Sequence, residues 1–152
     1  MAEIYSIMVK PELETRGKQD HSFDRVLVPE ASLEIGQGIQ GDAKGGRHPD
    51  RQLSILTLAW VEGLKSEGYI TTPGSFGEQL MISGLNVDEL GSGEHLALGE
   101  DAVIEITKPR LGCERLEAAQ QDLPFAGEKV GILARFVRGG VIRVGDPVLK
   151  GE

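Results

Sequence analysis

The distribution of glycine is the feature that most constrains how this chain can fold. The 152 residues include 21 glycines, and they are spread along the sequence rather than gathered in one segment. Glycine suits tight turns and weakens helix interiors, so this spacing favours short strands over long helices. The runs between the glycines often alternate apolar and polar residues, as half-buried strands do. The sequence therefore predicts a mainly-β protein.

The expected elements follow from these runs and from the residues that interrupt them. Strands are predicted at Ile4–Val9, Arg25–Val28, Gln52–Leu56, Phe76–Ile82, His95–Leu98, Ala102–Thr107, Gly131–Val137, Val141–Val144 and Pro147–Leu149. Pro109 is expected to end the strand before it. Helices are predicted after a Thr57 cap as far as Glu67, and at Glu114–Gln120. Many short strands with two modest helices indicate a small barrel or sandwich, because closure protects sheet edges.

Length and charge bound the class of protein. A chain of this length predicts one domain spanning residues 1–152. The formal net charge of −8 argues against attraction to nucleic acid or to an anionic membrane. Neither a signal peptide nor a membrane-spanning apolar run is recognisable. The single cysteine excludes an intrachain disulfide, so the expected location is the reducing cytoplasm.

Cys113 is the first candidate for chemistry. It follows a predicted strand and precedes the predicted helix Glu114–Gln120, with Lys108, Arg110 and Arg115 close in sequence. A helix start and neighbouring cations both stabilise a thiolate, which is the nucleophilic and metal-binding form of cysteine. The alternative is a buried, inert cysteine, a common fate of this residue type.

A second candidate is the glycine-rich loop Gly36–Arg51. Four basic residues stand out there against the acidic background: Lys44, Arg47, His48 and Arg51. Glycine backbone can turn several N–H groups toward one anion, and arginine adds a bidentate fork. A phosphate or carboxylate ligand fits this pattern, although the spacing is not that of a P-loop. The alternative is a solvated loop in which the cations pair with Asp42 and Asp50.

Glu78 is the third candidate, in the segment Pro73–Leu80. It follows Gly77 at the start of a predicted strand, where it could orient a basic side chain or accept a hydrogen bond from a ligand. The alternative is a surface carboxylate on an edge strand. The three histidines, His21, His48 and His95, lack metal-ligand spacing, so a structural zinc site is not expected.

Three segments, taken in order, resemble the MOSC domain, named for the C-terminal domain of molybdenum cofactor sulfurase. They are Gly41–Ser54 with its Gly-Asp pair and basic residues, Gly74–Leu80, and Pro109–Cys113. The later Gly145-Asp146 pair also fits the family, and the likeness runs from about Ile35 to Leu149. The chain departs from the family pattern at Lys44, Gln79 and Gly112, where histidine, asparagine and proline are usual.

The resemblance implies a small closed β-barrel with a few short helices that binds molybdenum cofactor (molybdopterin) or handles sulfur. It implies that Cys113 is the catalytic residue, as the molybdenum ligand or as a persulfide carrier. The anionic pterin would lie against Asp42, Lys44, Arg47, His48, Arg51, Glu78 and Arg110.

Three functions remain open at this point. The chain could be a molybdenum-dependent oxidoreductase that reduces N-hydroxylated compounds, and a separate electron-transfer protein would then be needed. It could be a non-enzymatic sulfur carrier supplied by a cysteine desulfurase. It could also be a partner-binding barrel with Cys113 buried in its core.

Overall fold

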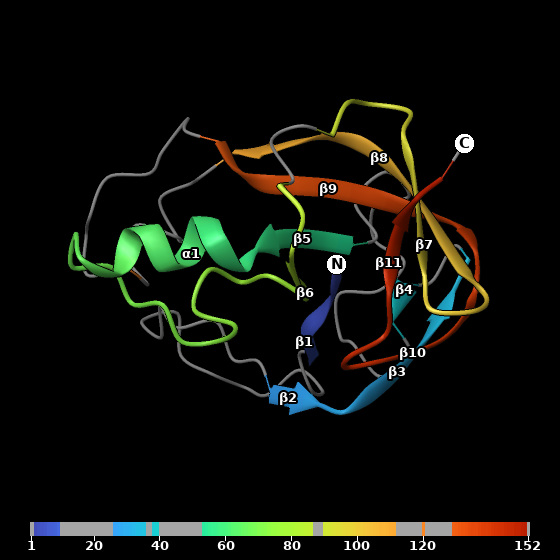
Figure 1. The fold of residues 1–152 in the computed structure, drawn as a ribbon, viewed down its shortest axis with the longest axis horizontal. Coiled ribbons are helices and arrows are strands. Elements are labelled where there is room, and N and C mark those ends of the chain that lie inside the picture. The colour runs from blue at the N-terminus through green and yellow to red at the C-terminus, as the bar shows by residue number, and fades with distance from the viewer. Residues whose placement is uncertain are drawn as a thin grey trace, which may run out of the picture.

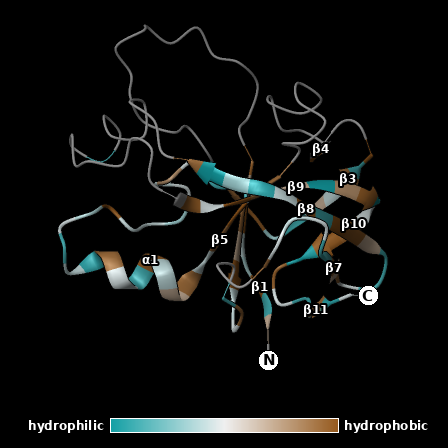
Figure 2. Cartoon of the chain, turned by 90° about the horizontal axis from the view of Figure 1, so that it is seen from above, coloured by the Kyte–Doolittle hydropathy of each residue, from teal (hydrophilic) through white to brown (hydrophobic). Residues whose placement is uncertain are grey.

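The computed structural model describes residues 2–9, 26–35, 38–39, 53–86, 90–111, 120 and 129–151 (Figure 1). Within these ranges the chain is mainly β, as predicted, with one α-helix. In both Figure 1 and Figure 2 the helix α1 extends at one end of the molecule, while β3, β4 and β10 lie toward the other.

The elements are short, as the glycine spacing predicts. In chain order they are β1 (Glu3–Val9), β2 (Val26–Val28), β3 (Glu30–Glu34), β4 (Gly38–Ile39), β5 (Leu53–Thr57), α1 (Leu58–Lys65), β6 (Leu80–Ser83), β7 (His95–Leu98), β8 (Ala102–Leu111), β9 (Lys129–Arg138), β10 (Gly140–Arg143) and β11 (Val148–Lys150). Among the strands of the described residues, only β8 and β9 reach ten residues, and together they form an extensive antiparallel ladder.

In the part of the chain that the structure describes, the strands form two sheets. The larger has eight strands in the order β11-β7-β8-β9-β5-β6-β1-β2, and the smaller has the order β10-β3-β4. The pairings are antiparallel except for β5 and β6, which run parallel and are connected through α1. This βαβ unit places the carboxyl ends of β5 and β6 at the same edge of the sheet.

The predicted closed barrel is corrected by this topology. The outer strands β11 and β2 are not paired with each other in the described part of the chain, so the large sheet is open. Its curvature nevertheless brings the start of β1 against the turn between β10 and β11. There the Ile4 N–H donates to the Asp146 carbonyl at 2.9 Å, and the Val148 N–H donates to the Ala2 carbonyl at 3.0 Å. These local bonds, with a single bridge between Glu3 and Pro147, stop short of a ladder.

Two predicted strand limits differ most from the structure. Pro109 does not end β8, which continues to Leu111; register shifts on both sides of Pro109 let the strand accommodate a residue without an N–H. The predicted strand Phe76–Ile82 begins only at Leu80. Gly74 and Gly77 have φ values of 86° and 74°, so the chain turns there instead of extending.

The hydrophobic core lies between the sheets and extends beneath α1. The main cluster draws on nearly every strand, and all five residues of β5 are buried. A second cluster joins Val61 of α1 to Leu56, Phe76, Met81 and Val130. Figure 2 shows hydrophobic colouring along β5 and the strands beside it. The two clusters share β5 and β6, so α1 packs on the large sheet through residues that adjoin the main core.

The helix α1 is shorter than predicted and ends at Lys65. Thr57 occupies the N-cap position, as expected, but its side chain makes no capping hydrogen bond. Gly68 takes a φ of 90° after the helix, consistent with the predicted stop. No helix in the described ranges is long and apolar enough to cross a membrane.

Candidate functional site

Glu78 lies between the turn of residues 73–76 and the start of β6, and its side chain is completely buried. The Gly74 N–H donates to Glu78 Oε2 at 2.7 Å, and the Phe76 N–H donates to Glu78 Oε1 at 3.2 Å. The carboxyl therefore organises the turn around itself. The interpretation of Glu78 as a surface carboxylate on an edge strand is wrong.

The charge of this carboxyl depends on opposing effects. Burial raises the pKa of Glu78 above its ordinary value, because the charged form loses its hydration. Hydrogen bonds from backbone N–H groups and the positive charge of Arg110 act to lower the pKa. Burial is the largest effect, so the neutral form persists to a higher pH than in an exposed glutamate. The fold thus brings Glu78 and Arg110, 32 positions apart in sequence, into electrostatic contact.

Arg110 is the second-to-last residue of β8. It is partly buried, whereas Lys108 and Pro109 beside it are exposed. Because β8 continues past Pro109, Arg110 lies within the strand, at the register shift between Pro109 and Leu111. Cys113 lies three residues further along the chain. The end of β8 therefore carries a cation to within three residues of the predicted thiolate.

Gln79 has a structural role beside Glu78. Its Oε1 accepts a hydrogen bond from the Ser54 N–H at 2.9 Å, and its own N–H donates to the Ser54 carbonyl at 3.1 Å. The Met8 N–H donates to the Gln79 carbonyl at 2.7 Å. Gln79 thus ties the turn to β5 and β1. These bonds explain why a buried amide side chain suits this position.

Gln120 is a structural residue that the sequence did not indicate. Its side chain is fully buried and forms a pair of bonds with the Ile70 backbone, at 2.7 Å to the N–H and 2.9 Å to the carbonyl. Its Nε2 also donates to the Ser75 carbonyl at 3.3 Å. The amide acts here like a strand partner for residues 70–75. A glutamine in a polar helix-like segment carries no pattern that would reveal this role.

An aromatic contact joins α1 to the Glu78 turn. The rings of Trp60 and Phe76 meet edge to face, with centroids 5.4 Å apart and planes at 65°. Phe76 is fully buried and belongs to the second core cluster. The turn is therefore fixed from one side by aromatic packing and from the other by its hydrogen bonds.

Of the predicted site residues, the structure describes Glu78 and Arg110 and brings them together. Cys113 and the loop residues Asp42, Lys44, Arg47, His48 and Arg51 lie outside the described residues, as does the predicted helix Glu114–Gln120 apart from Gln120. Their roles remain predictions. The described residues contain no group of three or more His, Cys, Asp or Glu side chains placed to hold a metal ion.

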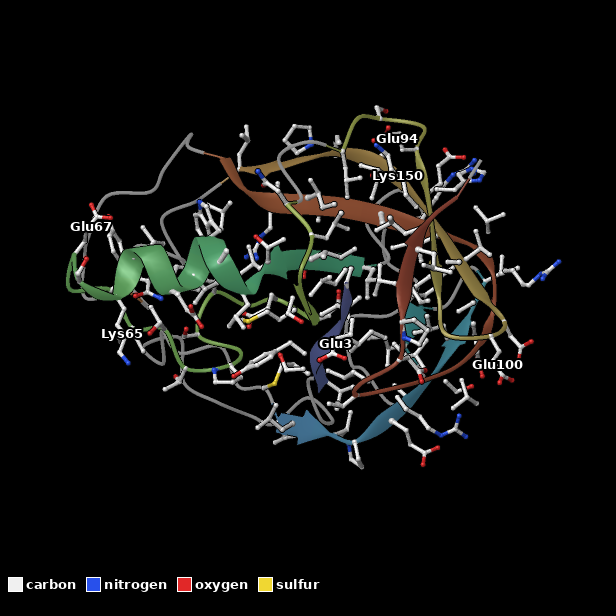
Figure 3. All side chains as sticks on the ribbon, in the orientation of Figure 1. Glu3, Lys65, Glu67, Glu94, Glu100 and Lys150 are labelled. Carbon is white, nitrogen blue, oxygen red and sulfur yellow. The ribbon has the colours of Figure 1, made fainter. Side chains whose placement is uncertain are left out.

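The charged residues of β7, β8 and β9 form a separate network. Arg135 donates to both Glu105 oxygens, at 3.1 and 3.2 Å, and His95 Nε2 lies 3.2 Å from Glu105 Oε1. The Arg135 guanidinium and then His95 hold the pKa of Glu105 below its ordinary value. Nearby, Lys150 Nζ lies 3.2 Å from Glu94 Oε1; both residues are labelled in Figure 3. These pairs connect neighbouring strands at the surface. The contact with Glu105 gives the His95 side chain a partner within the protein.

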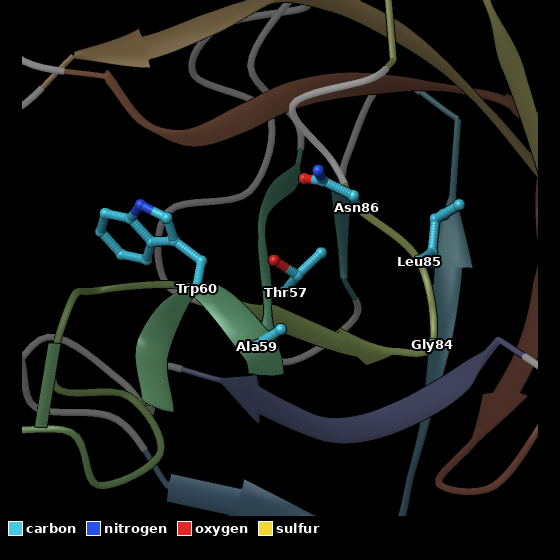
Figure 4. A pocket seen from close by; sticks show the side chains of 6 residues that line it. All are labelled: Thr57, Ala59, Trp60, Gly84, Leu85 and Asn86. Carbon is cyan, nitrogen blue, oxygen red and sulfur yellow. The ribbon is translucent and has the colours of Figure 1, made fainter. Parts of the chain in front are cut away.

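A pocket of about 460 Å³ opens at the start of α1 (Figure 4). It lies where β5 and β6 end, and its lining comes from both sides of that edge. The lining residues are Thr57, Ala59, Trp60, Gly84, Leu85 and Asn86. Sequence patterns did not point to it, because the pocket depends on the parallel pairing of β5 with β6.

Comparisons with known proteins agree with this fold. The MOSC domain model matches residues 42–149. The crystal structure of YiiM from Geobacillus stearothermophilus is 25% identical, covers 100% of this chain and 76% of that chain, and has a TM-score of 0.73. YiiM from Escherichia coli is 20% identical, with 97% and 69% of the two chains covered and a TM-score of 0.65.

The YuaD protein from Bacillus subtilis is 17% identical, with 97% of this chain and 94% of that chain covered and a TM-score of 0.69. No curated protein matches the chain significantly. The family match covers most of the sequence, including the segments that first suggested the resemblance. The chain belongs to the MOSC domain family.

Proposed function

We propose that this protein binds a molybdenum–pterin cofactor or handles sulfur through Cys113. The observation that carries the proposal is the delivery of Arg110 by β8 to the neighbourhood of Glu78, three residues before the cysteine. A fixed guanidinium close in sequence to a thiol favours the thiolate, which both roles require. Membership of the MOSC family supports the same assignment.

The residues present fit such a cofactor in their chemistry. Molybdenum bound by a pterin dithiolene takes a soft sulfur ligand, and Cys113 would supply it. Lys44, Arg47 and Arg51 would hold the phosphate, and Asp42, His48 and Arg110 would line the pterin side. When bound, the cofactor supplies two-electron redox chemistry, which suits reduction of N-hydroxylated compounds with electrons from a separate protein.

The Glu78 turn would position the cation in this arrangement. The carboxyl is satisfied by the Gly74 and Phe76 N–H groups, so its place does not depend on a ligand. Its proximity to Arg110 would help to fix the orientation of the guanidinium. Glu78 is therefore proposed as a positioning residue.

A persulfide carrier is the second candidate, and one sequence observation favours it. The chain has no second cysteine that could resolve a persulfide on Cys113 by forming an intrachain disulfide. A sulfur placed there by a cysteine desulfurase would persist until an acceptor removed it. The lone thiol also supports a reducing, cytoplasmic setting.

Metal and pterin analysis tests the cofactor role. The full chain is purified from a host that makes molybdenum cofactor, beside Cys113→Ser and Arg110→Met. Arg138→Met, at an exposed position of β9, is the matched control. The proposal predicts molybdenum and pterin in the wild type and in Arg138→Met, and their loss from Cys113→Ser. Equal molybdenum in Cys113→Ser and wild type would contradict the role of the thiol.

Sulfur loading tests the carrier role. Wild-type protein is incubated with a cysteine desulfurase and cysteine, and its intact mass is measured. An increase equal to one sulfur atom that is absent from Cys113→Ser supports the carrier. An unchanged mass in the wild type, with the desulfurase shown to be active, excludes it.

A further inference from the structure

The backbone stretch 70–76, before β6, is linked to the chain on both sides of Cys113. Before the cysteine, the positive charge of Arg110 acts on the Glu78 carboxyl, which fixes the turn in this stretch. After the cysteine, the Gln120 side chain bonds to the same stretch of backbone. In sequence, Arg110 lies three positions before Cys113, and Gln120 lies seven positions after it. One short stretch therefore meets both flanks of the segment that carries the thiol.

The Gln120 contacts suit a buried amide in this place. The side chain has no exposed surface, and its Oε1 accepts a hydrogen bond from the Ile70 N–H at 2.7 Å. Its Nε2 donates to the Ile70 carbonyl at 2.9 Å and to the Ser75 carbonyl at 3.3 Å. An amide nitrogen has two N–H donors, so both have acceptors here. Because an unpartnered buried amide is costly, these bonds oppose the departure of Gln120 from the stretch 70–76.

Gln120 also has a special place along the chain. Leu111 at the end of β8 pairs with Lys129 at the start of β9, so residues 112–128 form a connection that leaves the β8–β9 ladder and returns to it. Gln120 is the central residue of that connection, and Cys113 lies near its beginning. A chain fixed at its midpoint has far fewer conformations than one fixed only at its ends. The Gln120 bonds therefore restrict the segment that contains the thiol.

We propose that Gln120 is a positioning residue for Cys113. By fixing the midpoint of the β8–β9 connection to residues 70–76, it keeps the thiol close to the Arg110 guanidinium. The inference rests on the proposed function, in which a thiolate at Cys113 holds a metal or a sulfur atom. A nearby cation stabilises a thiolate, and the attraction weakens as the two groups move apart. Release of Gln120 would therefore weaken the influence of the cation on the thiol.

Alkylation tests this role, because the chain has a single cysteine. Native protein at low ionic strength is treated with iodoacetate, which is anionic, or with iodoacetamide, which is neutral. Both reagents consume the same thiolate, so the ratio of their rates reports the local potential more than the access to the thiol. We expect the wild-type ratio to exceed that of the urea-unfolded chain about threefold or more. A potential of one kT raises the local concentration of a monovalent anion by about that factor.

Gln120→Leu removes all three bonds while keeping a side chain of similar size, and its ratio should fall toward that of the unfolded chain. Ser75→Ala is the matched control. It removes the bond of 2.7 Å from the Ser75 hydroxyl to the Ile70 carbonyl and leaves the Gln120 contacts in place. Ile142→Ala controls for lost stability, because it truncates a buried residue of β10, toward the other end of the molecule (Figure 1). Both controls should keep the wild-type ratio.

Three results would overturn the positioning role: a wild-type ratio equal to that of the unfolded chain, a wild-type ratio in Gln120→Leu, or an equal loss of the ratio in Ile142→Ala. If Gln120→Leu does not fold, Gln120→Asn is judged by the same criteria, because its amide is one methylene group too short to keep these contacts. Molybdenum and sulfur loading of the wild type is measured separately. A chain that loads neither, but whose ratio falls in Gln120→Leu, refutes the proposed function and keeps the positioning role.

Discussion

At the scale of single residues, several buried polar side chains hold main-chain groups in place through hydrogen bonds. Glu78, Gln79 and Gln120 are all buried, and each bonds to main-chain groups of a neighbouring segment. Glu78 was predicted as a site residue from its position after Gly77 and from the family resemblance, but its burial was not foreseeable. Burial depends on the turn at Gly74 and Gly77, and a single sequence does not show that those glycines have positive φ.

The raised pKa of Glu78 predicts a pH dependence of stability. In the native protein this carboxyl keeps its proton at a pH where the unfolded chain has lost it. The native state then binds more protons, so the free energy of unfolding falls as pH rises from the ordinary glutamate pKa through the raised pKa. Urea unfolding of wild type and Glu78→Gln at several pH values between about 4 and 7 measures this effect. The fall in unfolding free energy that the carboxyl causes should be absent from the variant.

The control for Glu78→Gln is Ser66→Ala, at an exposed position after α1, which should follow the wild-type pH curve. Arg110→Met should extend the falling segment to higher pH, because the positive charge that lowers the Glu78 pKa is gone. If wild type and Glu78→Gln differ by the same free energy at every pH, the carboxyl does not titrate differently on folding.

Gln120→Ala should lower the free energy of unfolding by more than a surface substitution does. The substitution leaves the Ile70 N–H and carbonyl without their side-chain partner in a partly buried place. A loss of about 2–4 kcal/mol in unfolding free energy is expected, because each unsatisfied buried group costs about 1–3 kcal/mol. Denaturant unfolding measures it, with the exposed Glu67→Ala as control. A loss below about 0.5 kcal/mol, the level of surface substitutions, would show that these bonds contribute little.

At the scale of elements, strand identity was more predictable than strand limits. His95–Leu98 was predicted with its observed bounds, because its residues alternate between polar and apolar positions and glycines lie on both sides of it. β3 and β4 were missed because β4 has only two residues and lies in a glycine-rich stretch. The extension of β8 past Pro109 was missed because it depends on irregular pairing with β9.

Two glycines in different elements should respond oppositely to alanine. Gly131 in β9 has a φ of 76°, and an added Cβ would overlap the Ile55 carbonyl oxygen of β5. Gly131→Ala should therefore destabilise the β5–β9 pairing by several kcal/mol, because both backbone strain and a backbone clash oppose it. Gly63 in α1 has open space around it, and Gly63→Ala should stabilise by about 0.5–1 kcal/mol.

Thermal unfolding of the two alanine variants provides the comparison. Each serves as the other's control, since the chemical change is identical. A stable Gly131→Ala protein with an unchanged melting temperature would mean that β5 and β9 do not approach as closely as described.

At the scale of the whole molecule, sequence reasoning predicted the mainly-β class and the family but not the topology. The parallel β5–β6 pair could not be read from periodicity, because buried parallel strands and other buried runs look alike. The open sheet was mistaken for a barrel because pairing between its outer strands is decided by curvature. The chemistry at Cys113 and in the glycine-rich loop remains a prediction from sequence and family.

The order of the sheet predicts a gradient of hydrogen exchange. β5 is central and wholly buried, whereas β2 is an outer strand with exposed Val26 and Leu27. Amides of β5 should exchange only through global unfolding, and those of β2 should exchange through local opening. Exchange measured by NMR should therefore be slowest in β5 and fastest in β2. Equal protection of the two strands would indicate that β2 has a further partner.

Cys113, as the residue that holds a cofactor or a sulfur atom, is central to the proposed function. Native mass spectrometry of protein taken directly from a cofactor-competent host tests this most directly. The wild type is predicted to carry added mass that corresponds to the molybdenum–pterin cofactor or to one sulfur atom, and Cys113→Ser is predicted to carry none. A wild-type mass equal to the bare chain, in a host shown to load another molybdenum protein and to contain an active desulfurase, would contradict the account.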